Sequence, residues 1–397
     1  MNILIQQTKA FPHRANSFYW FYYQLTEWLT NHGIKSELFF CYLEVDDSGF
    51  DNGLLLPDRY PQFYTPRNIE AICKYIKDKQ IDVILDYSHV ITGDTKKYYQ
   101  EIRRRNPALK IFTMIHNCPS HTTQLQKYKL SLLRFKDVHG AKQLFQWMLP
   151  GLYIWLLKKV VARQNRSAYD TLDEVVLLSP SYIPEFRKLI KIKDADRLSA
   201  IPNSIRPVES HIPIEQKNRE IIFVGRMEHE KALPKLLKIW EMIQKRLPDW
   251  QLTLLGDGSQ AEAIRKIISQ KKLQRVNVMG HQMAIPYIDR ARIICLTSVI
   301  EGLPTVFVEA MSLGVVPVGF ASFNAIYDMI EDGKNGFIIP EDQYEEYAEV
   351  VLKLAEDDQL RYRIATQAQS QKEQYDIEHI GPLWMDVFKK HGLVKHE

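Results

Sequence analysis

Two glutamates, Glu301 and Glu309, stand at a predicted junction between a buried strand and a helix. The apolar run Ile293–Leu296 predicts the strand, and Pro304 fits the first position of a helix that Gly314 ends. Free amides and the dipole at such a helix start favour phosphate. Because carboxylates repel phosphate, the two glutamates would suit hydroxyls on either side of a diphosphate, on a sugar and on a ribose. An ordinary helix start with an exposed glutamate fits these residues equally well.

Two cations follow an earlier predicted strand in the same half of the chain. Residues 221–224 predict a buried strand, and Arg226 and Lys231 lie in the turn before the next helix, where they would neutralise a diphosphate. Ordinary surface cations are the alternative. Neighbouring predicted strands end in turns suited to close backbone approach or contact with a nucleotide base, at Gly256 and at Met279, Gly280 and His281.

The first half of the chain alternates short apolar runs with helix-length stretches. This order predicts a parallel sheet with helices on both faces, the doubly wound α/β arrangement, with strands at 3–5, 37–42, 83–85, 110–115 and 174–178. Ligands bind at the carboxyl ends of such strands. His116 follows the fourth strand, so it is a candidate to bind a substrate hydroxyl or transfer a proton. A structural histidine fits equally well, and His121 is the weaker candidate.

The loop after the first strand, residues 6–16, is expected at the same edge of the sheet. It carries Lys9, His13 and Arg14 and leads into a helix that starts near Ser17, whose free amides would also face an anion. No glycine-rich phosphate loop is present in this stretch. We interpret the aromatic residues that follow as core packing.

The composition is that of a soluble globular protein, with 45% hydrophobic and 25% charged residues. A length of 397 residues accommodates two ordinary domains. The four cysteines are scattered without metal-ligand spacing, which argues for a reducing compartment and against a disulfide or zinc framework. The chain enters a strand-like run at once, so we expect no signal peptide and a cytoplasmic protein.

The net charge of +4 is unevenly placed. Nine Lys and Arg stand against the single acid Asp137 between residues 121 and 166, and residues 125–161 combine amphipathic helical spacing with two tryptophans and a break at Pro150. The apolar part is shorter than the ~20 residues of a membrane span. We therefore expect helices lying in an anionic membrane surface. Helices packed over the sheet are the alternative. Nucleic-acid binding is disfavoured, since we find neither zinc ligands nor a recognition helix.

Four motifs spread over residues 221–340 resemble the retaining glycosyltransferases of family four. They are Phe223-Val224-Gly225-Arg226 with Lys231, Leu255-Gly256-Asp257-Gly258, Val278-Met279-Gly280, and the E-x7-E signature formed by Glu301 and Glu309. The resemblance implies the GT-B fold, an α/β fold of two Rossmann-like doubly wound domains facing across a cleft. The chain departs from the family pattern in its first loop, where many relatives have a Gly-Gly pair and residues 11–17 have none.

The resemblance also implies a role for each candidate residue. Arg226 and Lys231 would bind the donor diphosphate together with Thr305 and Val306, and Glu309 would bind the ribose. Further contacts to the nucleotide would come from Gly256, Met279, Gly280 and His281.

The donor sugar would be held at the junction itself. By the same resemblance Glu301, Gly302 and Leu303 would contact the transferred sugar. His116 matches the family's histidine near the scissile bond, so His116 and Glu301 are the catalytic candidates. No metal site and no cofactor are expected.

The function that the resemblance implies is a retaining, metal-independent glycosyltransferase. It would move a hexose or N-acetylhexosamine from a nucleotide-diphosphate sugar to a glycolipid or lipid-linked saccharide in surface-polysaccharide synthesis. A GT-B epimerase and a non-catalytic nucleotide-sugar binder are the alternatives. The protein would lie peripherally on the anionic inner face of the cell membrane.

Residues 201–207 and the polar run that continues to Asn218 are typical of a linker, so we expect a domain boundary near residue 205. An N-terminal acceptor-binding domain would cover 1–205, with the basic insertion near 121–166. A nucleotide-sugar-binding domain would cover 206–375, and a C-terminal helix within 376–397 would pack back on the first domain.

Overall fold

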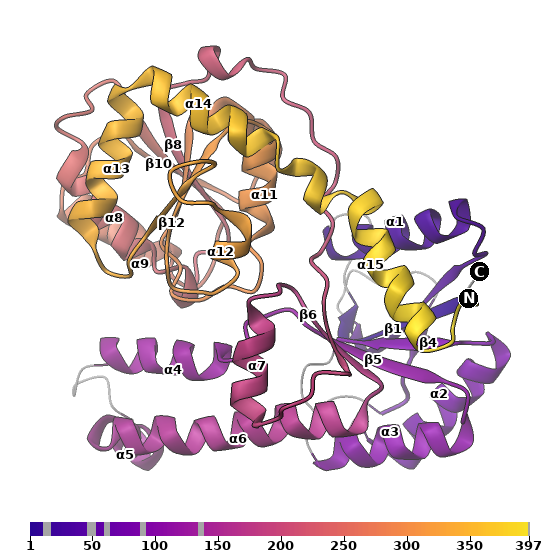
Figure 1. Ribbon diagram of the computed structural model, residues 1–397. Helices are drawn as coiled ribbons and strands as arrows, with labels where there is room; N and C mark the ends of the chain where they lie inside the picture. The colour runs from indigo at the N-terminus through magenta and orange to yellow at the C-terminus, as the bar shows by residue number, and fades with distance from the viewer. Residues whose placement is uncertain (11–16, 46–52, 59–63, 88–92, 134–138, 396–397) are drawn as a thin grey trace. The chain divides into compact units, whose positions relative to one another are not determined.

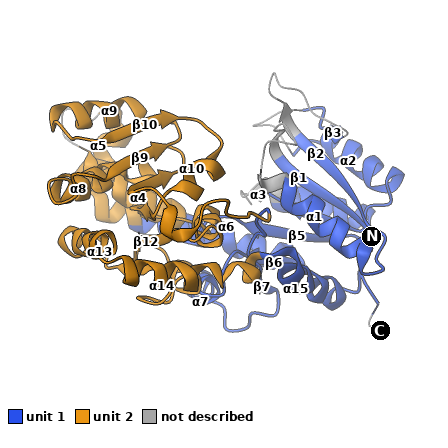
Figure 2. Ribbon diagram, turned by 90° about the horizontal axis from the view of Figure 1, so that it is seen from above, with its two compact units in different colours: residues 1–120, 155–206, 376–397 blue, residues 121–154, 207–375 orange. Residues whose placement is uncertain are grey.

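The chain forms two α/β units, each built on one parallel sheet, in a computed structural model (Figure 1). The structure describes residues 1–10, 17–45, 53–58, 64–87, 93–133 and 139–395. The first unit comprises residues 1–120, 155–206 and 376–397, and the second comprises 121–154 and 207–375 (Figure 2). Residues 121–154 therefore group with the second unit, although they precede its sheet in the chain.

The sheet of the first unit has the strand order β3-β2-β1-β4-β5-β6-β7. Its strands are β1 (Asn2–Ala10), β2 (Glu37–Val45), β3 (Gly53–Leu55), β4 (Val83–Asp86), β5 (Lys110–Ile115), β6 (Glu174–Leu177) and β7 (Leu198–Ala200). The order reverses between β1 and β4, as in doubly wound sheets. The five predicted strands are confirmed. β3 and β7 were not predicted, because three residues are too few to show a pattern.

The helices of this unit are α1 (Ser17–Asn31), α2 (Pro66–Asp78), α3 (Gly93–Arg105), most of α6 (Pro150–Thr171), α7 (Tyr182–Ile190) and α15 (Ile377–Lys390). Helices α2, α3 and α6 share with the strands a core of apolar and tyrosine side chains that includes Leu4, Ile84, Tyr98, Tyr99 and Ile111. Helix α15 packs against α1 so closely that a Cβ on Gly381 would lie 2.4 Å from the Trp28 ring. The C-terminal helix is therefore part of the first unit.

The sheet of the second unit has the order β10-β9-β8-β11-β12-β13. Its strands are β8 (Glu220–Val224), β9 (Gln251–Leu255), β10 (Val276–Gly280), β11 (Ile293–Leu296), β12 (Val316–Phe320) and β13 (Phe337–Ile339). Every residue of β11 and β12 is buried. This burial explains why both strands read as continuous apolar runs in the sequence.

The helices of the second unit are α4 (His121–Leu132), α5 (Gly140–Met148), α8 (Leu233–Ile243), α9 (Ala261–Gln270), α10 (Ala284–Arg290), α11 (Thr305–Ser312), α12 (Ile326–Met329), α13 (Tyr344–Glu356) and α14 (Asp358–Gln369). They lie between and after its strands, except for α4 and α5, which precede its sheet in the chain. The 3-10 turns are η2 (Ile214–Gln216), η3 (His229–Lys231) and η4 (Lys372–Tyr375). Helix α8 buries Leu233, Leu236, Leu237 and Trp240, which recur at helical spacing.

The amphipathic basic segment forms α4, α5 and the start of α6, with the expected break before Pro150. Among the described residues, no helix has the length and apolar character needed to cross a bilayer. All four cysteines lie in the described residues, where they are buried and form no disulfide.

Candidate active site

The predicted junction around Glu301 is formed by β11, a connecting loop and α11. Helix α11 begins at Thr305, so the prediction that Pro304 is its first residue is wrong by one position. The reason is that Pro304 has a ψ of 89°, outside the helical range. Gly314 follows the end of the helix with a φ of +69°, as predicted for a terminating glycine. The loop places Glu301, Gly302 and Leu303 directly before the helix start.

Lys231 and Glu301 form an ion pair in this loop. Lys231 Nζ donates to Glu301 Oε1 at 2.6 Å, and the two side chains are only 17% and 10% exposed. Lys231 ends the turn η3, and the Val299 amide ties this turn to the β11 loop by donating to the Glu230 carbonyl at 2.8 Å. Two loops from neighbouring strands thus hold a cation and a carboxylate together.

Arg226 lies in the same turn but is far more accessible than Lys231. Its side chain is 74% exposed and donates to Glu230 Oε1 at 3.0 Å. Glu230 was not predicted as a site residue. Its only sequence signal is its position directly before Lys231. The turn therefore offers one shielded and one exposed cation, and Glu230 orients the exposed one.

His121 belongs to this charged cluster, although the sequence ranked it below His116. Burial lowers the pKa of His121, while the carboxylates of Glu230 and Glu301 act in the opposite direction. No local pattern reveals this neighbourhood, because it depends on α4 packing with the second unit. His116 is described within the first unit, where it follows β5 and its ring stacks on Tyr87 at 4.3 Å between centroids.

Glu309 lies in α11, five residues into the helix counted from Thr305. It is half-buried, and burial raises the pKa of its carboxyl group to about 7. Thr305 and Val306 are the first two residues of α11, whose opening amides have no partner within the helix. The helix therefore presents amides at its start and a carboxyl group one turn further on.

The glycine turns differ in what they approach. Gly256 has a φ of +130°, and a Cβ there would lie 2.0 Å from the Gly225 carbonyl oxygen. The close approach that Gly256 permits is thus to the protein's own backbone. Gly280 has a φ of +70° and open space around it, and its neighbours Met279 and His281 are exposed. The end of β10 is therefore accessible to a ligand.

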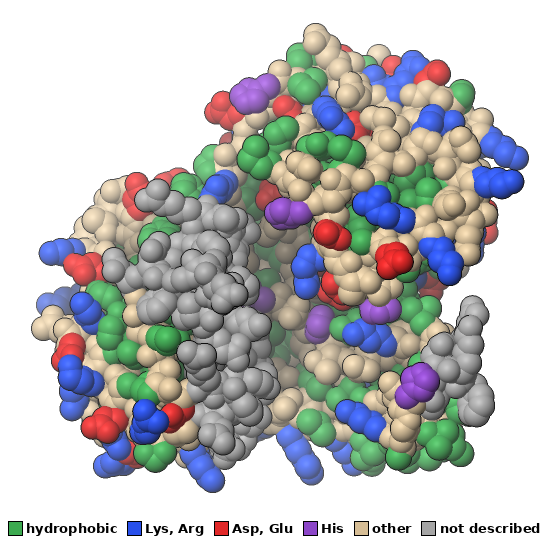
Figure 3. Space-filling view, turned by 180° about the vertical axis from the view of Figure 1, so that it is seen from behind, with side chains coloured by type: hydrophobic (Ala, Val, Ile, Leu, Met, Phe, Trp, Pro, Cys, Tyr) green, Lys and Arg blue, Asp and Glu red, His purple; other side chains and the backbone are tan. Residues whose placement is uncertain are grey.

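Some predicted features cannot be placed. His13 and Arg14 lie outside the described residues, as does the rest of the loop 11–16. Within the described ranges, no group of three or more His, Cys, Asp and Glu is arranged to hold a metal ion. On the face drawn in Figure 3, acidic and basic side chains are interspersed over the described part of the surface.

The two Rossmann-like units define the GT-B fold, and solved structures of glycosyltransferases share it. The chain resembles Anabaena HepE, solved in complex with UDP, with a TM-score of 0.70 and 15% identity over 98% of this chain and 99% of that chain. It also resembles sucrose-phosphate synthase from Thermosynechococcus elongatus, with a TM-score of 0.73 and 14% identity over 99% of both chains. The predicted α/β fold class is confirmed.

The sequence comparisons match parts of the chain. Residues 207–371 match the family model described as "Glycosyl transferases group 1". An uncharacterized glycosyltransferase of Haemophilus influenzae is 27% identical over 222 residues, 55% of this chain and 62% of that protein. A Campylobacter jejuni alpha-1,4-N-acetyl-D-galactosaminyltransferase, whose name includes PP-undecaprenol, is 24% identical over 174 residues, 43% and 48% of the two chains. The matches thus span less than two thirds of these curated relatives.

Proposed function

We propose that the protein is a glycosyltransferase that moves a hexose or N-acetylhexosamine from a nucleotide-diphosphate sugar. The observation that carries this proposal is the shielded pair of Lys231 and Glu301 directly before α11. The pair lies in the segment that matches the family model, 207–371. A cation, a carboxylate and a helix start are together the groups that a sugar diphosphate requires.

The candidate site can stabilise the charges that develop during sugar transfer. When the bond to the sugar breaks, the diphosphate leaves with an extra negative charge and the sugar becomes electron-poor. Arg226, Lys231 and the α11 amides stabilise the departing diphosphate without a metal, because fixed donors need no reorganisation. Glu301 accepts hydrogen bonds from the sugar hydroxyls, and Glu309 accepts them from the ribose.

We propose retention at the anomeric carbon. Several relatives are named for alpha-linked products, among them the Campylobacter jejuni enzyme and the poly(glycerol-phosphate) alpha-glucosyltransferase of Bacillus subtilis. An alpha-linked product made from an alpha-linked nucleotide sugar requires retention. Because HepE was solved with UDP and with UDP-glucose, uridine nucleotides are the first donors to test.

We propose an acceptor that is a glycolipid or a lipid-linked saccharide at an anionic membrane surface. Helices α5 and α6 expose large apolar side chains, including Trp147 at 41%, Met148 at 61% and Trp155 at 51%. Lys159 Nζ lies 3.5 Å from the Trp155 ring centroid, so a cation accompanies the apolar surface. Such a surface suits the boundary between lipid headgroups and acyl chains, on the cytoplasmic face.

A thermal-shift screen of nucleotide diphosphates and nucleotide sugars tests the donor site. A nucleotide that binds the folded chain raises Tm by mass action, with about 2.7 kcal/mol of stabilisation at a hundred times its Kd. We expect UDP to raise the Tm of the native protein and of the surface variant Lys266→Met, and not that of Lys231→Met. No shift with any nucleotide would contradict the proposal.

A further inference from the structure

A hollow of about 760 Å³ lies between α4 and residues of α8, α13 and neighbouring loops of the second unit. Helix α4 lines it with Gln124, Lys127, Tyr128 and Ser131, and with Leu132 at its end. The first four positions follow the i, i+3, i+4, i+7 spacing, so they form one face of the helix. A helix that packs on a core presents an apolar stripe at this spacing, whereas α4 presents polar groups.

Helix α4 also buries very little of its own surface. Thr123 is its one fully buried residue, and Leu132 is 51% exposed. The face turned to the hollow is therefore not a packing face in the usual sense. Its amide, ammonium and tyrosine hydroxyl groups are the donors and acceptors of a binding surface, whereas the Ser131 hydroxyl donates to the Tyr128 carbonyl at 2.7 Å and can only accept.

The opposite wall contains a lysine in an unusual place. Lys235 lies on the buried side of α8, where the other buried residues are apolar, and its side chain is only 10% exposed. Its amino group lies 2.8 Å from Asp342 Oδ1 and 3.5 Å from Glu341 Oε1. Burying a paired lysine contributes little net stability compared with an apolar residue. Lys235 therefore holds two carboxylates in fixed positions at the edge of the hollow.

Two tyrosine rings lie near this charged group. The Tyr128 ring centroid of α4 lies 5.7 Å from Lys235 Nζ. The Tyr344 hydroxyl donates to Asp342 Oδ1 at 2.9 Å, and Lys238 Nζ lies 3.7 Å from the Tyr344 ring centroid. Three lysines and two acids nearly balance one another, so the hollow favours a hydroxyl-rich ligand over a strongly charged one.

The hollow adjoins the candidate active site but is distinct from it. Val299, two residues before Glu301, lines it, and so does Pro234, three residues after Lys231. Among the residues described as lining the hollow, neither Glu301 nor Lys231 occurs, and Arg226 and Glu309 are also absent. A ligand here would lie next to the donor sugar without occupying the donor site.

We propose that this hollow binds a pyranose ring of the acceptor saccharide. A pyranose presents apolar C–H faces and a rim of hydroxyls, which match tyrosine rings flanked by carboxylates, ammonium groups and an amide. The inference rests on the proposed glycosyltransferase function and names the acceptor subsite.

Saturation-transfer NMR on the full chain tests the subsite. The probes are the methyl α- and β-glycosides of glucose, galactose, N-acetylglucosamine and N-acetylgalactosamine, which lack a lipid tail and so avoid the apolar surface of α5 and α6. We expect at least one glycoside to receive saturation through its ring protons, in the presence and in the absence of UDP. The Tyr128→Ala variant should weaken its binding about tenfold, while Tyr128→Phe retains the ring and most of the affinity.

Two glutamine variants on α4 distinguish a loss of glycoside binding from a general effect on folding. Gln124→Ala, which faces the hollow, should weaken glycoside binding, and Gln126→Ala on another face of the helix should not. UDP affinity should stay unchanged in all four variants. Equal glycoside binding by Tyr128→Ala and the native chain, or no binding of any glycoside, would overturn the subsite while UDP binding continues to support the proposed function. If the native chain bound no nucleotide diphosphate at all, that result would instead contradict the proposed function.

Discussion

The amino group of Lys231 lies 2.6 Å from the Glu301 carboxylate, and both side chains are largely shielded from solvent. A pair of this kind adds little to stability, because desolvation offsets most of the attraction. The pair instead fixes the position of the Lys231 ammonium group, which is held in the loop before α11 even without a ligand. In the proposed function, Lys231 turns to the bound diphosphate and Glu301 becomes available to the sugar hydroxyls.

Removing the Lys231 charge should therefore impair catalysis. Lys231→Met loses one fixed donor to the leaving diphosphate, which costs about 100- to 1000-fold in kcat. Steady-state transfer with the donor found by thermal shift measures this loss. Lys266→Met, on the exposed side of α9, is the control with unchanged kcat. A Lys231→Met variant with native kcat would exclude Lys231 from the site.

The Glu309 carboxyl group should make the folded state less stable as pH rises. Burial raises the pKa of Glu309 to about 7 in the folded chain, above its ordinary value of 4.5. Between these pH values the folded state binds more protons than the unfolded state, so this group lowers stability as pH rises. Glu309→Gln should raise Tm relative to the native protein at pH 8, with little difference at pH 4.

The exposed Glu345 of α13 supplies the control for this titration. Glu345→Gln should change Tm by a similar small amount at both pH values. A Glu309→Gln difference that is the same at pH 4 and pH 8 would contradict the burial of that carboxyl group.

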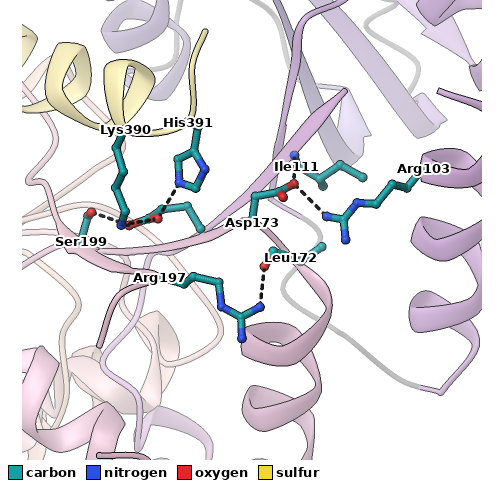
Figure 4. Close-up of polar contacts among 9 residues, drawn as sticks. Arg103, Ile111, Leu172, Asp173, Arg197, Ser199, Lys390 and His391 are labelled. Carbon is teal, nitrogen blue, oxygen red and sulfur yellow. Dashed lines mark hydrogen bonds and ion pairs between the residues drawn. The ribbon is translucent and has the colours of Figure 1, made fainter. Parts of the chain in front are cut away.

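A buried glutamate fixes the C-terminal helix to the first unit. Glu174 is fully buried and accepts from Lys390 Nζ at 2.8 Å, with His391 and Ser199 as further partners (Figure 4). Burial alone would raise the pKa of Glu174, but these hydrogen bonds outweigh it and hold the pKa below its ordinary value. The stabilisation is present above the ordinary pKa and is lost as pH falls below it.

Glu174→Gln should therefore destabilise the protein by about 1–3 kcal/mol at pH 7, and by less in acid. Denaturant unfolding at the two pH values measures the change. Asp170→Asn removes only an exposed pair with Arg166, so it should cost less than about 1 kcal/mol. Equal costs for the two variants would show that Glu174 does not anchor α15.

The exposed aromatic surface should govern membrane binding. Replacing both Trp147 and Trp155 by Ser removes two large rings from the α5 and α6 surface. Co-sedimentation with vesicles of phosphatidylglycerol at low salt should fall at least about tenfold, because each ring contributes apolar burial at the interface. Native binding by the double variant, or no vesicle binding by the native chain, would refute the membrane proposal.

The two glycine turns should respond differently to an added methyl group. Gly256→Ala forces a Cβ to 2.0 Å from the Gly225 carbonyl oxygen, so we expect a loss of more than about 2 kcal/mol of stability. Gly280→Ala meets open space and carries only the cost of a positive φ, about 1 kcal/mol. Denaturant unfolding of both variants checks which substitution costs more. A larger cost for Gly280→Ala would contradict the close approach of the turns that follow β8 and β9.

Local patterns predicted much of the fold. The central strands β4, β6, β11 and β12 are fully buried, and their apolar residues made them recognisable. Gly314 marks the end of α11 because it has a positive φ. Pro304 was misplaced by one residue, since proline fits both the first helical position and the residue before it. The strands β3 and β7 are too short to leave a pattern.

The site was predicted in part, for a physical reason. Glu301 and Lys231 each stand in a recognisable strand-to-helix turn, yet their ion pair depends on β8 and β11 being neighbours in the sheet. The proximity of His121 to Glu230 depends on a tertiary contact between α4 and the rest of the second unit, residues 207–375. No local spacing in the sequence encodes such a contact. The hollow beneath α4 has the same origin.

The anomeric configuration of a transfer product tests the account most directly. The full chain would be incubated with the nucleotide sugar that raises its Tm and a panel of octyl glycosides, and the product linkage read by proton NMR. We predict an alpha-linked glycoside from an alpha-linked donor, absent with Glu301→Gln and with Lys231→Met. Saturable donor binding without any glycoside product, or a product of inverted configuration, would contradict a retaining glycosyltransferase.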